Sequence, residues 1–235
     1  MDNSIISCNN LCIGYGKKIL TEAINLEIEA NQWFGILGEN GIGKSTFFKT
    51  ILGILPYVSG TVKVLGDSPG KKNHKISYIP QERTLNITDN LSGISLIKAN
   101  YRASYFGLPS FGKQLNQKIR YLLTTVGAEN YAKKSFNTLS GGQKKRIFLA
   151  QALINNPVLL LLDEPLSDLD SQAKHDFVQA LKKIHNQESI TLLIISHDMY
   201  DIAHELDNFI HFKNQKTHVR YSLPDLRTKD TNVRI

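Results

Sequence analysis

The chain of 235 residues carries a formal net charge of +7, with 41% hydrophobic and 21% charged residues. These values are typical of a globular protein and exclude a disordered chain or a repeat array, and the length suits one large domain or a core with an inserted lobe. A basic balance can mark a protein that works on nucleic acid or beside anionic lipid, but scattered lysines and arginines more often solvate a surface. Because arginine-rich blocks interleaved with aromatics are absent from the sequence, we expect no nucleic-acid partner.

The apolar runs are short. The longest, Val158–Leu162 and Leu192–Ile195, fall far below the roughly 20 residues that cross a bilayer. Residues 1–8 lack a basic stretch followed by an apolar one, so no secretory signal is expected. Cys8 and Cys12 are the only cysteines, and without a second Cys or His pair at metal-site spacing they are expected to be reduced structural thiols. These features predict a cytoplasmic protein.

The chain begins with a β region. Residues 4–37 alternate apolar and polar positions, most clearly over Ala23–Glu29, and Trp33–Leu37 is typical of a short buried strand. A helix is expected from Lys44 to Leu55, ended by Pro56.

A phosphate-binding loop is predicted between this strand and this helix. Residues 38–46 fit G-x-x-x-x-G-K-[ST], whose glycines bring backbone N–H groups onto phosphates while the helix N-terminus adds partial positive charge. The alternative is a glycine-rich turn with a chance Lys-Ser pair. The expected nucleotide-binding residues of the loop are Gly38, Glu39, Asn40, Gly41, Ile42, Gly43, Lys44, Ser45 and Thr46.

Two further strands, Gly60–Gly66 and Lys75–Ile79, are expected in the core sheet. From about residue 86 the spacing becomes helical, which predicts an inserted helical lobe. Alternating strand and helix then return, with strands over Val158–Leu162 and Thr191–Ile195 and an amphipathic helix over residues 171–186.

Two adjacent carboxylates, Asp163 and Glu164, follow the apolar strand at 158–162. Parallel strands place ligands at their carboxyl ends, the edge that also holds the phosphate loop. Asp163 can hold Mg²⁺ together with Ser45, since Mg²⁺ prefers oxygen ligands and substrate phosphates, and Glu164 can polarise an attacking water. Ordinary helix-capping carboxylates at a strand end are the alternative.

A second anion-binding helix start is predicted at Leu139–Gln143, before a helix that ends ahead of Pro157. Ser140 is a natural N-cap, and the two glycines that follow permit close backbone approach to an anion. One chain has no evident second nucleotide for this segment, so a partner chain could supply it.

Taken together, these segments resemble the nucleotide-binding subunit of an ATP-binding cassette transporter, whose signature is the Leu-Ser-Gly-Gly-Gln found at 139–143. The resemblance covers nearly the whole chain. It implies an α/β fold with a P-loop NTPase core, a mostly parallel sheet, an N-terminal antiparallel β region and an inserted α-helical lobe. It implies one ATP-binding domain over 1–235, with the core in 1–85 and 149–235 and the lobe in 86–148. ATP hydrolysis with ATP and Mg²⁺ bound is expected.

The resemblance also assigns roles to single residues. It implies that Tyr15 stacks on adenine, with core packing as the alternative. It implies that Gln81 reaches Mg²⁺ and the attacking water, and that His197 contacts the γ-phosphate, although a lone strand-end histidine is more often structural. The expected catalytic residues are Glu164, His197 and Gln81, and the expected metal ligands are Ser45, Gln81 and Asp163. Further nucleotide contacts are expected from Ser140, Gly141, Gly142, Gln143 and Asp170.

The segment Ser167–Asp170 is similar to the family's D-loop, usually Ser-Ala-Leu-Asp, and departs from it by the charge of Asp168. The stretch 78–90 and Val126–Ala128 look similar to importers of zinc or manganese, whereas Lys144 and Lys145 make the segment after the signature more basic than in ordinary metal-importer cassettes.

The resemblance implies several partners: a second copy of the chain in a dimer that sandwiches ATP, integral membrane permease subunits, and a substrate-binding protein. The chain would then lie on the inner face of the cell membrane. The alternative is a soluble ATPase of the same superfamily, acting in cluster assembly or cell division. A nucleotide-binding regulator without turnover is disfavoured because Glu164 and His197 are both present.

Histidines recur every seventh residue at 197, 204, 211 and 218. On one helix such a stripe could bind a metal, but Phe209–Phe212 alternates like a strand, so coincidence is the preferred interpretation. The tail beyond Asn214 is expected to be irregular.

Overall fold

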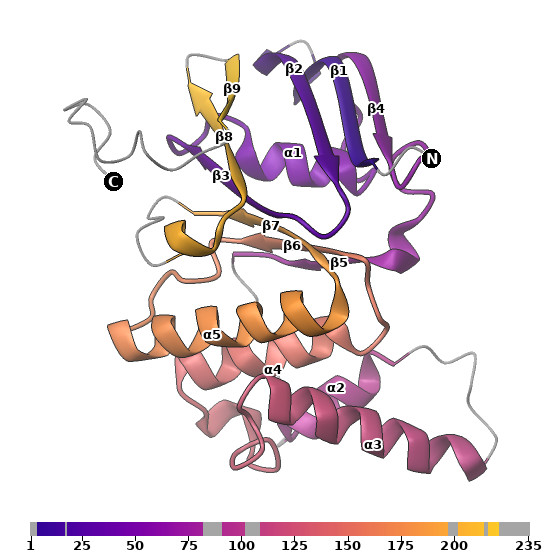
Figure 1. Cartoon of the computed structure of the whole chain (residues 1–235), viewed down its shortest axis with the longest axis vertical. Coiled ribbons are helices and arrows are strands. Elements are labelled where there is room, and N and C mark those ends of the chain that lie inside the picture. The colour runs from indigo at the N-terminus through magenta and orange to yellow at the C-terminus, as the bar shows by residue number, and fades with distance from the viewer. Residues whose placement is uncertain are drawn as a thin grey trace.

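The computed structural model describes residues 4–16, 18–81, 91–101, 109–196, 202–213 and 216–220. Figure 1 shows a small sheet formed by β1, β2 and β4 over helix α1, a larger sheet beneath α1, and the helices α2, α3, α4 and α5 on the far side of the larger sheet. The expected mixture of an N-terminal antiparallel β region, a mostly parallel sheet and a helical layer is therefore present.

The small sheet has the order β2-β1-β4 and is antiparallel. Its strands are β1 (Ser4–Tyr15), β2 (Lys18–Glu29) and β4 (Ser59–Val64). The prediction that residues 60–66 belong to the core sheet is wrong, because β4 pairs with β1. Along β4 only Val62 and Val64 are buried, in alternation, which fits an antiparallel sheet that covers the core with one face.

The larger sheet has the order β5-β6-β7-β3-β8-β9. Pairing is parallel from β5 to β8 and antiparallel between β8 and β9. The expectation of an irregular tail is wrong in part, because residues 216–220 form the edge strand β9. The strands are β3 (Trp33–Gly38), β5 (Ile76–Ile79), β6 (Leu159–Asp163), β7 (Thr191–Ile195), β8 (Asn208–Lys213) and β9 (Lys216–Arg220).

The helices are α1 (Lys44–Ile51), α2 (Gly93–Ala99), α3 (Pro109–Thr125), α4 (Gly141–Leu153) and α5 (Ser171–Glu188). Short 3₁₀ turns cover Asn73–Lys75, Phe136–Thr138 and Ala203–Glu205. Helix α1 ends at Ile51, earlier than the predicted Leu55. The cause is Gly53, whose φ of 68° is left-handed and whose missing Cβ would lie 2.9 Å from the Gly70 backbone. The predicted lobe boundary at residue 148 falls inside α4.

Both faces of the larger sheet are covered. Strand β6 shows this best, because Leu160 and Leu162 pack in the hydrophobic cluster with the helices, whereas Leu159 and Leu161 pack in a second cluster with α1 and the small sheet. All four leucines are fully buried. A parallel sheet of this kind is expected to be apolar throughout, and its parallel strands carry the residues that follow β3, β5, β6 and β7 to one common edge.

The heptad-spaced histidines do not share a helix. His204 lies in a 3₁₀ turn, while His211 and His218 are register partners on β8 and β9. His197 lies outside the described residues. Within the described ranges, His, Cys, Asp and Glu form no group of three that could hold a metal ion.

Across the same ranges, no helix is long and apolar enough to pass through a membrane.

Candidate nucleotide-binding site

The predicted phosphate loop joins β3 to α1. Three of its glycines adopt left-handed backbone angles, with φ of 148° at Gly38, 79° at Gly41 and 115° at Gly43. A Cβ at Gly38 would lie 2.6 Å from the carbonyl oxygen of Phe212 on β8, so the loop requires glycine there for space as well as for conformation. Among the described residues, no side chain caps the N-terminus of α1 and its first turn holds no acidic group. Such a helix start can receive an anion.

Lys44 folds back over the loop. Its Nζ donates to the carbonyl oxygens of Gly38 at 2.5 Å and Glu39 at 3.0 Å, and the residue is 6% exposed. Burial lowers the pKa of Lys44, and the carboxylates of Glu164, Asp163 and Glu39 oppose that effect. The ammonium is therefore held inside the loop within the field of three carboxylates.

Asp163 ends β6 and is buried. Its Oδ2 accepts a hydrogen bond of 3.1 Å from the hydroxyl of Tyr78, whereas its Oδ1 is buried and has no hydrogen-bond partner among the described residues. A buried acceptor without a partner is costly, so this oxygen has capacity for a cation or a water.

Glu164 follows at the first turn after β6. Its backbone N–H donates to the carbonyl of Ile195 at 2.9 Å, and the residue is 5% exposed. Its φ of 49° is left-handed. Such a backbone costs free energy in a residue with a Cβ and occurs often at functional sites.

One hollow of about 160 Å³ joins these groups. It lies between the phosphate loop and the ends of β5, β6 and β7, so the parallel sheet brings together the segments that the sequence predicted. The lining residues are Asn40, Gly41, Gly43, Lys44, Ser45, Thr46, Gln81, Asp163, Glu164 and Ile195.

Tyr15 lies beside the loop at the end of β1. It is 49% exposed, and its hydroxyl oxygen accepts a hydrogen bond of 3.3 Å from Thr46 Oγ1. The alternative of core packing is therefore wrong. An exposed ring next to the phosphate loop is available for stacking. His197, the other residue expected near the phosphates, lies outside the described residues.

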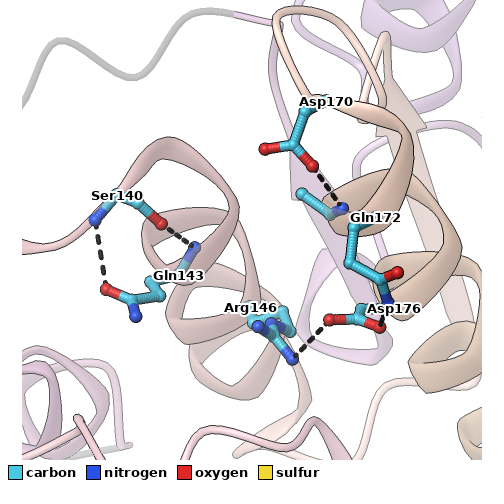
Figure 2. A network of polar contacts seen from close by, with 7 residues as sticks. Ser140, Gln143, Arg146, Asp170, Gln172 and Asp176 are labelled. Atoms are coloured by element: carbon cyan, nitrogen blue, oxygen red, sulfur yellow. Dashed lines mark hydrogen bonds and ion pairs between the residues drawn. The ribbon is translucent and has the colours of Figure 1, made fainter.

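The predicted second helix start at Ser140 does not line this hollow. It forms a capping box at the N-terminus of α4: Gln143 N–H donates to Ser140 Oγ at 3.3 Å, and Ser140 N–H donates to Gln143 Oε1 at 3.1 Å. Figure 2 shows this box beside the start of α5, where Asp170 Oδ1 accepts from the N–H of Ala173 at 2.8 Å.

The starts of α4 and α5 are packed closely. A Cβ at Gly142 would lie 2.9 Å from the Cβ of Ala173, and Arg146 on α4 forms an ion pair of 3.7 Å with Asp176 on α5. Ser140 and Gly141 remain exposed, so their surface is free to meet another molecule.

A family model described as ABC transporter matches residues 21–167 of this chain. The chain belongs to the ABC transporter family. It is the ATPase component of such a system, which binds and hydrolyses ATP. The resemblance drawn from the motifs is thereby confirmed.

The names of relatives of this ABC ATPase give different transported substrates. It is 31% identical over 195 residues to the manganese transport system ATP-binding protein MntB of Bacillus subtilis (strain 168), covering 83% of this chain and 77% of the relative. It is 34% identical over 211 residues to the zinc import ATP-binding protein ZnuC of Wigglesworthia glossinidia brevipalpis, covering 89% and 83%. It is also 33% identical over 220 residues to the spermidine/putrescine import ATP-binding protein PotA of Borreliella afzelii (strain PKo), covering 89% and 60%.

The fold of the ABC ATPase is also confirmed by a solved structure. The cbiO1 protein from Clostridium perfringens, part of the ABC transporter complex cbiONQ, matches with a TM-score of 0.81 and 26% identity, covering 92% of this chain and 87% of that chain.

Two residues of the site were missed by the sequence analysis. Thr21 is fully buried on β2, and its hydroxyl donates to the carbonyl of Ile42 in the phosphate loop at 2.7 Å. Tyr78 on β5 donates to Asp163, as described above. Thr21 occupies an inward position of an alternating strand, whereas Tyr78 lies in a short strand that does not alternate. Neither pattern identifies a hydrogen-bond partner.

We expect Thr21→Val to weaken the phosphate loop. The change removes a buried hydrogen bond and leaves the Ile42 carbonyl without its donor, which should lower the free energy of unfolding by about 1 to 3 kcal/mol. Thermal denaturation and an ATP titration measure the effect, and ATP affinity should fall several-fold. Thr21→Ser keeps the hydroxyl and is the control. Equal affinity and stability in Thr21→Val and the wild type would contradict the anchoring role.

Proposed function

We propose that this chain is the ATP-hydrolysing subunit of an importer in the cytoplasmic membrane, and that the transported substrate is a metal cation such as zinc or manganese. The proposed ATP hydrolysis rests on one observation: the phosphate loop, Asp163 and Glu164 line a common hollow. The transport part is supported by relatives that are named as ATP-binding proteins of manganese and zinc systems.

The phosphates of ATP would bind at the start of α1. The glycine turns present backbone N–H groups to the anion, and the uncapped helix start adds partial positive charge. Lys44 would exchange its two carbonyl acceptors for phosphate oxygens. A charged acceptor gives the stronger hydrogen bond, so this exchange favours the bound state. Tyr15 would stack on the base.

The donor set also fits Mg²⁺. Asp163 Oδ1 is a buried carboxylate oxygen without a partner among the described residues. Ser45 and Gln81, which can offer a hydroxyl and an amide oxygen, line the same hollow. Oxygen ligands of this kind suit Mg²⁺. When bound, the ion neutralises charge on the β- and γ-phosphates.

Glu164 would orient the attacking water and accept its proton. Glu164 lines the hollow that the phosphate loop also lines, and the residue is buried. A base held out of bulk water can orient the water that attacks the γ-phosphate in line with the leaving group. His197, which follows β7 by two positions, is proposed to contact the γ-phosphate.

A second copy of the chain would complete the site. Ser140 and Gly141 are exposed at a helix start that does not line the hollow of its own chain. We place them, with Gly142, Gln143 and Asp170, against the nucleotide of a partner in a head-to-tail dimer. ATP would hold this dimer closed and hydrolysis would loosen it. The movement would pass to permease subunits through the proposed lobe, residues 86–148, with the core, 1–85 and 149–235, lying at the inner face of the membrane.

The decisive experiment is purification from membranes, followed by transport. A tagged chain is isolated from cells that make it, copurifying integral membrane proteins are identified by mass spectrometry, and the complex is placed in lipid vesicles with its substrate-binding protein. We expect a permease to copurify, and ATP-dependent uptake of Zn²⁺ or Mn²⁺ that is lost in the complex carrying Glu164→Gln.

Spermidine is the matched test cation, because a spermidine/putrescine relative has similar identity to this chain. Uptake of spermidine without uptake of either metal would overturn the metal assignment alone. Absence of any membrane partner, with ATP hydrolysis intact, would overturn the transport role and favour a soluble ABC ATPase.

A further inference from the structure

Lys145 connects two functional segments of the chain. It lies on α4, two residues after Gln143. Its Nζ donates to the carbonyl oxygen of Ser167 and lies 3.3 Å from Ser167 Oγ. Helix α4 begins at Ser140 and Gly141, two exposed residues that together are called the serine–glycine corner. Ser167 belongs to the turn that follows β6. The lysine therefore joins the corner's own helix to the turn that carries Glu164.

The contact continues to the backbone of Glu164. Ser167 Oγ donates to the carbonyl oxygen of Glu164 at 2.9 Å, and the N–H of Ser167 lies 3.3 Å from the same oxygen. Within this turn Glu164 and Asp168 both have left-handed backbones, with φ of 49° and 60°. Two such residues are retained only where the surroundings determine the conformation. Lys145 supplies part of those surroundings.

The electrostatic setting suits a fixed cation. Burial lowers the pKa of Lys145, while the negative charges of Asp168 and Glu164 oppose that effect. A partly desolvated ammonium must find acceptors, and a charge-assisted hydrogen bond to a carbonyl is stronger than a neutral one. The two neighbouring cations point elsewhere: Lys144 lies 5.7 Å from the ring centroid of Phe136, and Arg146 pairs with Asp176.

We propose that Lys145 is a positioning residue for ATP hydrolysis, which ties α4 to the turn 164–168 and so fixes the backbone that carries Glu164. The inference rests on the proposed role of Glu164 as the base. It gives the exposed corner at Ser140 a direct physical connection to the catalytic carboxylate of the same chain. A change at that corner on dimer closure would reach Glu164 through the side chains of Lys145 and Ser167.

The test compares lysine variants in steady-state ATP hydrolysis and nucleotide titration. Lys145→Met removes the donor and the charge at similar length, Lys145→Gln keeps a donor without the charge, and Lys144→Met is the matched control on the same helix. We expect Lys145→Met to lower kcat about ten-fold, an effect of about 1.4 kcal/mol, with KM for ATP and nucleotide affinity within about two-fold of wild type. Lys145→Gln should recover most of kcat, and Lys144→Met should behave as wild type.

A double-mutant cycle tests the contact itself. Ser167→Ala removes the hydroxyl that links the lysine to Glu164, so the pair Lys145→Met and Ser167→Ala should lose less kcat together than the product of the single losses. If Lys145→Met does not fold, Lys145→Ala removes the same donor and charge and takes its place in the cycle.

Three outcomes would overturn the inference. Wild-type kcat in Lys145→Met would show that the tie does not matter. Parallel losses of kcat, nucleotide affinity and melting temperature would show a general structural role. Independent effects in the cycle would exclude the connection from Lys145 to Glu164 through the Ser167 hydroxyl. Normal turnover of Glu164→Gln would be a different failure, because it removes the premise about Glu164 before any lysine variant is considered.

Discussion

Glu164→Gln is expected to lower kcat for ATP hydrolysis about a thousand-fold while ATP binding stays near the wild-type level. The amide is isosteric with the carboxylate, so the buried turn after β6 keeps its shape. The amide cannot accept a proton from the attacking water. It also lacks the negative charge with which Glu164 raises the pKa of Lys44. Phosphate release measures turnover, and fluorescence titration with a nucleotide analogue measures binding.

The same variant should accumulate as an ATP-bound dimer. If ATP closes two copies and hydrolysis opens them, a chain that binds without hydrolysing should remain closed, which light scattering with ATP and with ADP can measure. Glu27→Gln, on an exposed position of β2, is the control for the same chemical change outside the site. Turnover of Glu164→Gln within a few-fold of wild type would remove Glu164 from the catalytic role.

Lys44→Ala is expected to weaken ATP binding about a hundred-fold, or about 2.7 kcal/mol, which is within the range for losing charge-assisted hydrogen bonds to phosphate. Because Lys44 Nζ already holds the carbonyls of Gly38 and Glu39, the change also releases the loop. Calorimetric titration measures the affinity. Lys49→Ala, in the last turn of the same helix, should bind ATP as the wild type does, and unchanged affinity in Lys44→Ala would contradict the assignment.

The pH dependence of binding follows from the same side chain. Burial lowers the pKa of Lys44 in the free protein, and added phosphate charge would raise it in the complex. ATP affinity should then fall as the pH rises through the pKa of the free protein, because binding there requires uptake of a proton. In Lys44→Ala this alkaline decline should be absent. Comparing the pH dependence of ATP affinity in the two proteins separates the contribution of the Lys44 charge from that of its packing.

The local sequence pattern was enough to predict the strands and the loop that form the site. The buried strand at Thr191–Ile195 has the predicted bounds, and the glycine loop lies between a strand and a helix as its motif requires. These predictions succeeded because a strand buried on both faces is apolar throughout, and because positive φ angles select glycine.

Pairing between distant segments was less predictable. The strand at residues 59–64 was placed in the wrong sheet because period-two alternation identifies a strand without identifying its neighbour. The strand at 216–220 was missed because its pairing with β8 is not visible in its own composition. The hydrogen bonds of Thr21, Tyr78 and Lys145 span 21, 85 and 22 residues, so no local pattern could predict them.

Strand β6 has leucines in both hydrophobic clusters and ends in Asp163. The neighbouring strand β7 is divided in the same way, because Leu192 and Ile194 pack with the helices and Leu193 and Ile195 pack in the other cluster. The strand that ends in Asp163, with Glu164 directly after it, is thus packed in both hydrophobic clusters. Asp163 is therefore held by packing on both faces of the sheet, so repacking of either cluster would shift this carboxylate.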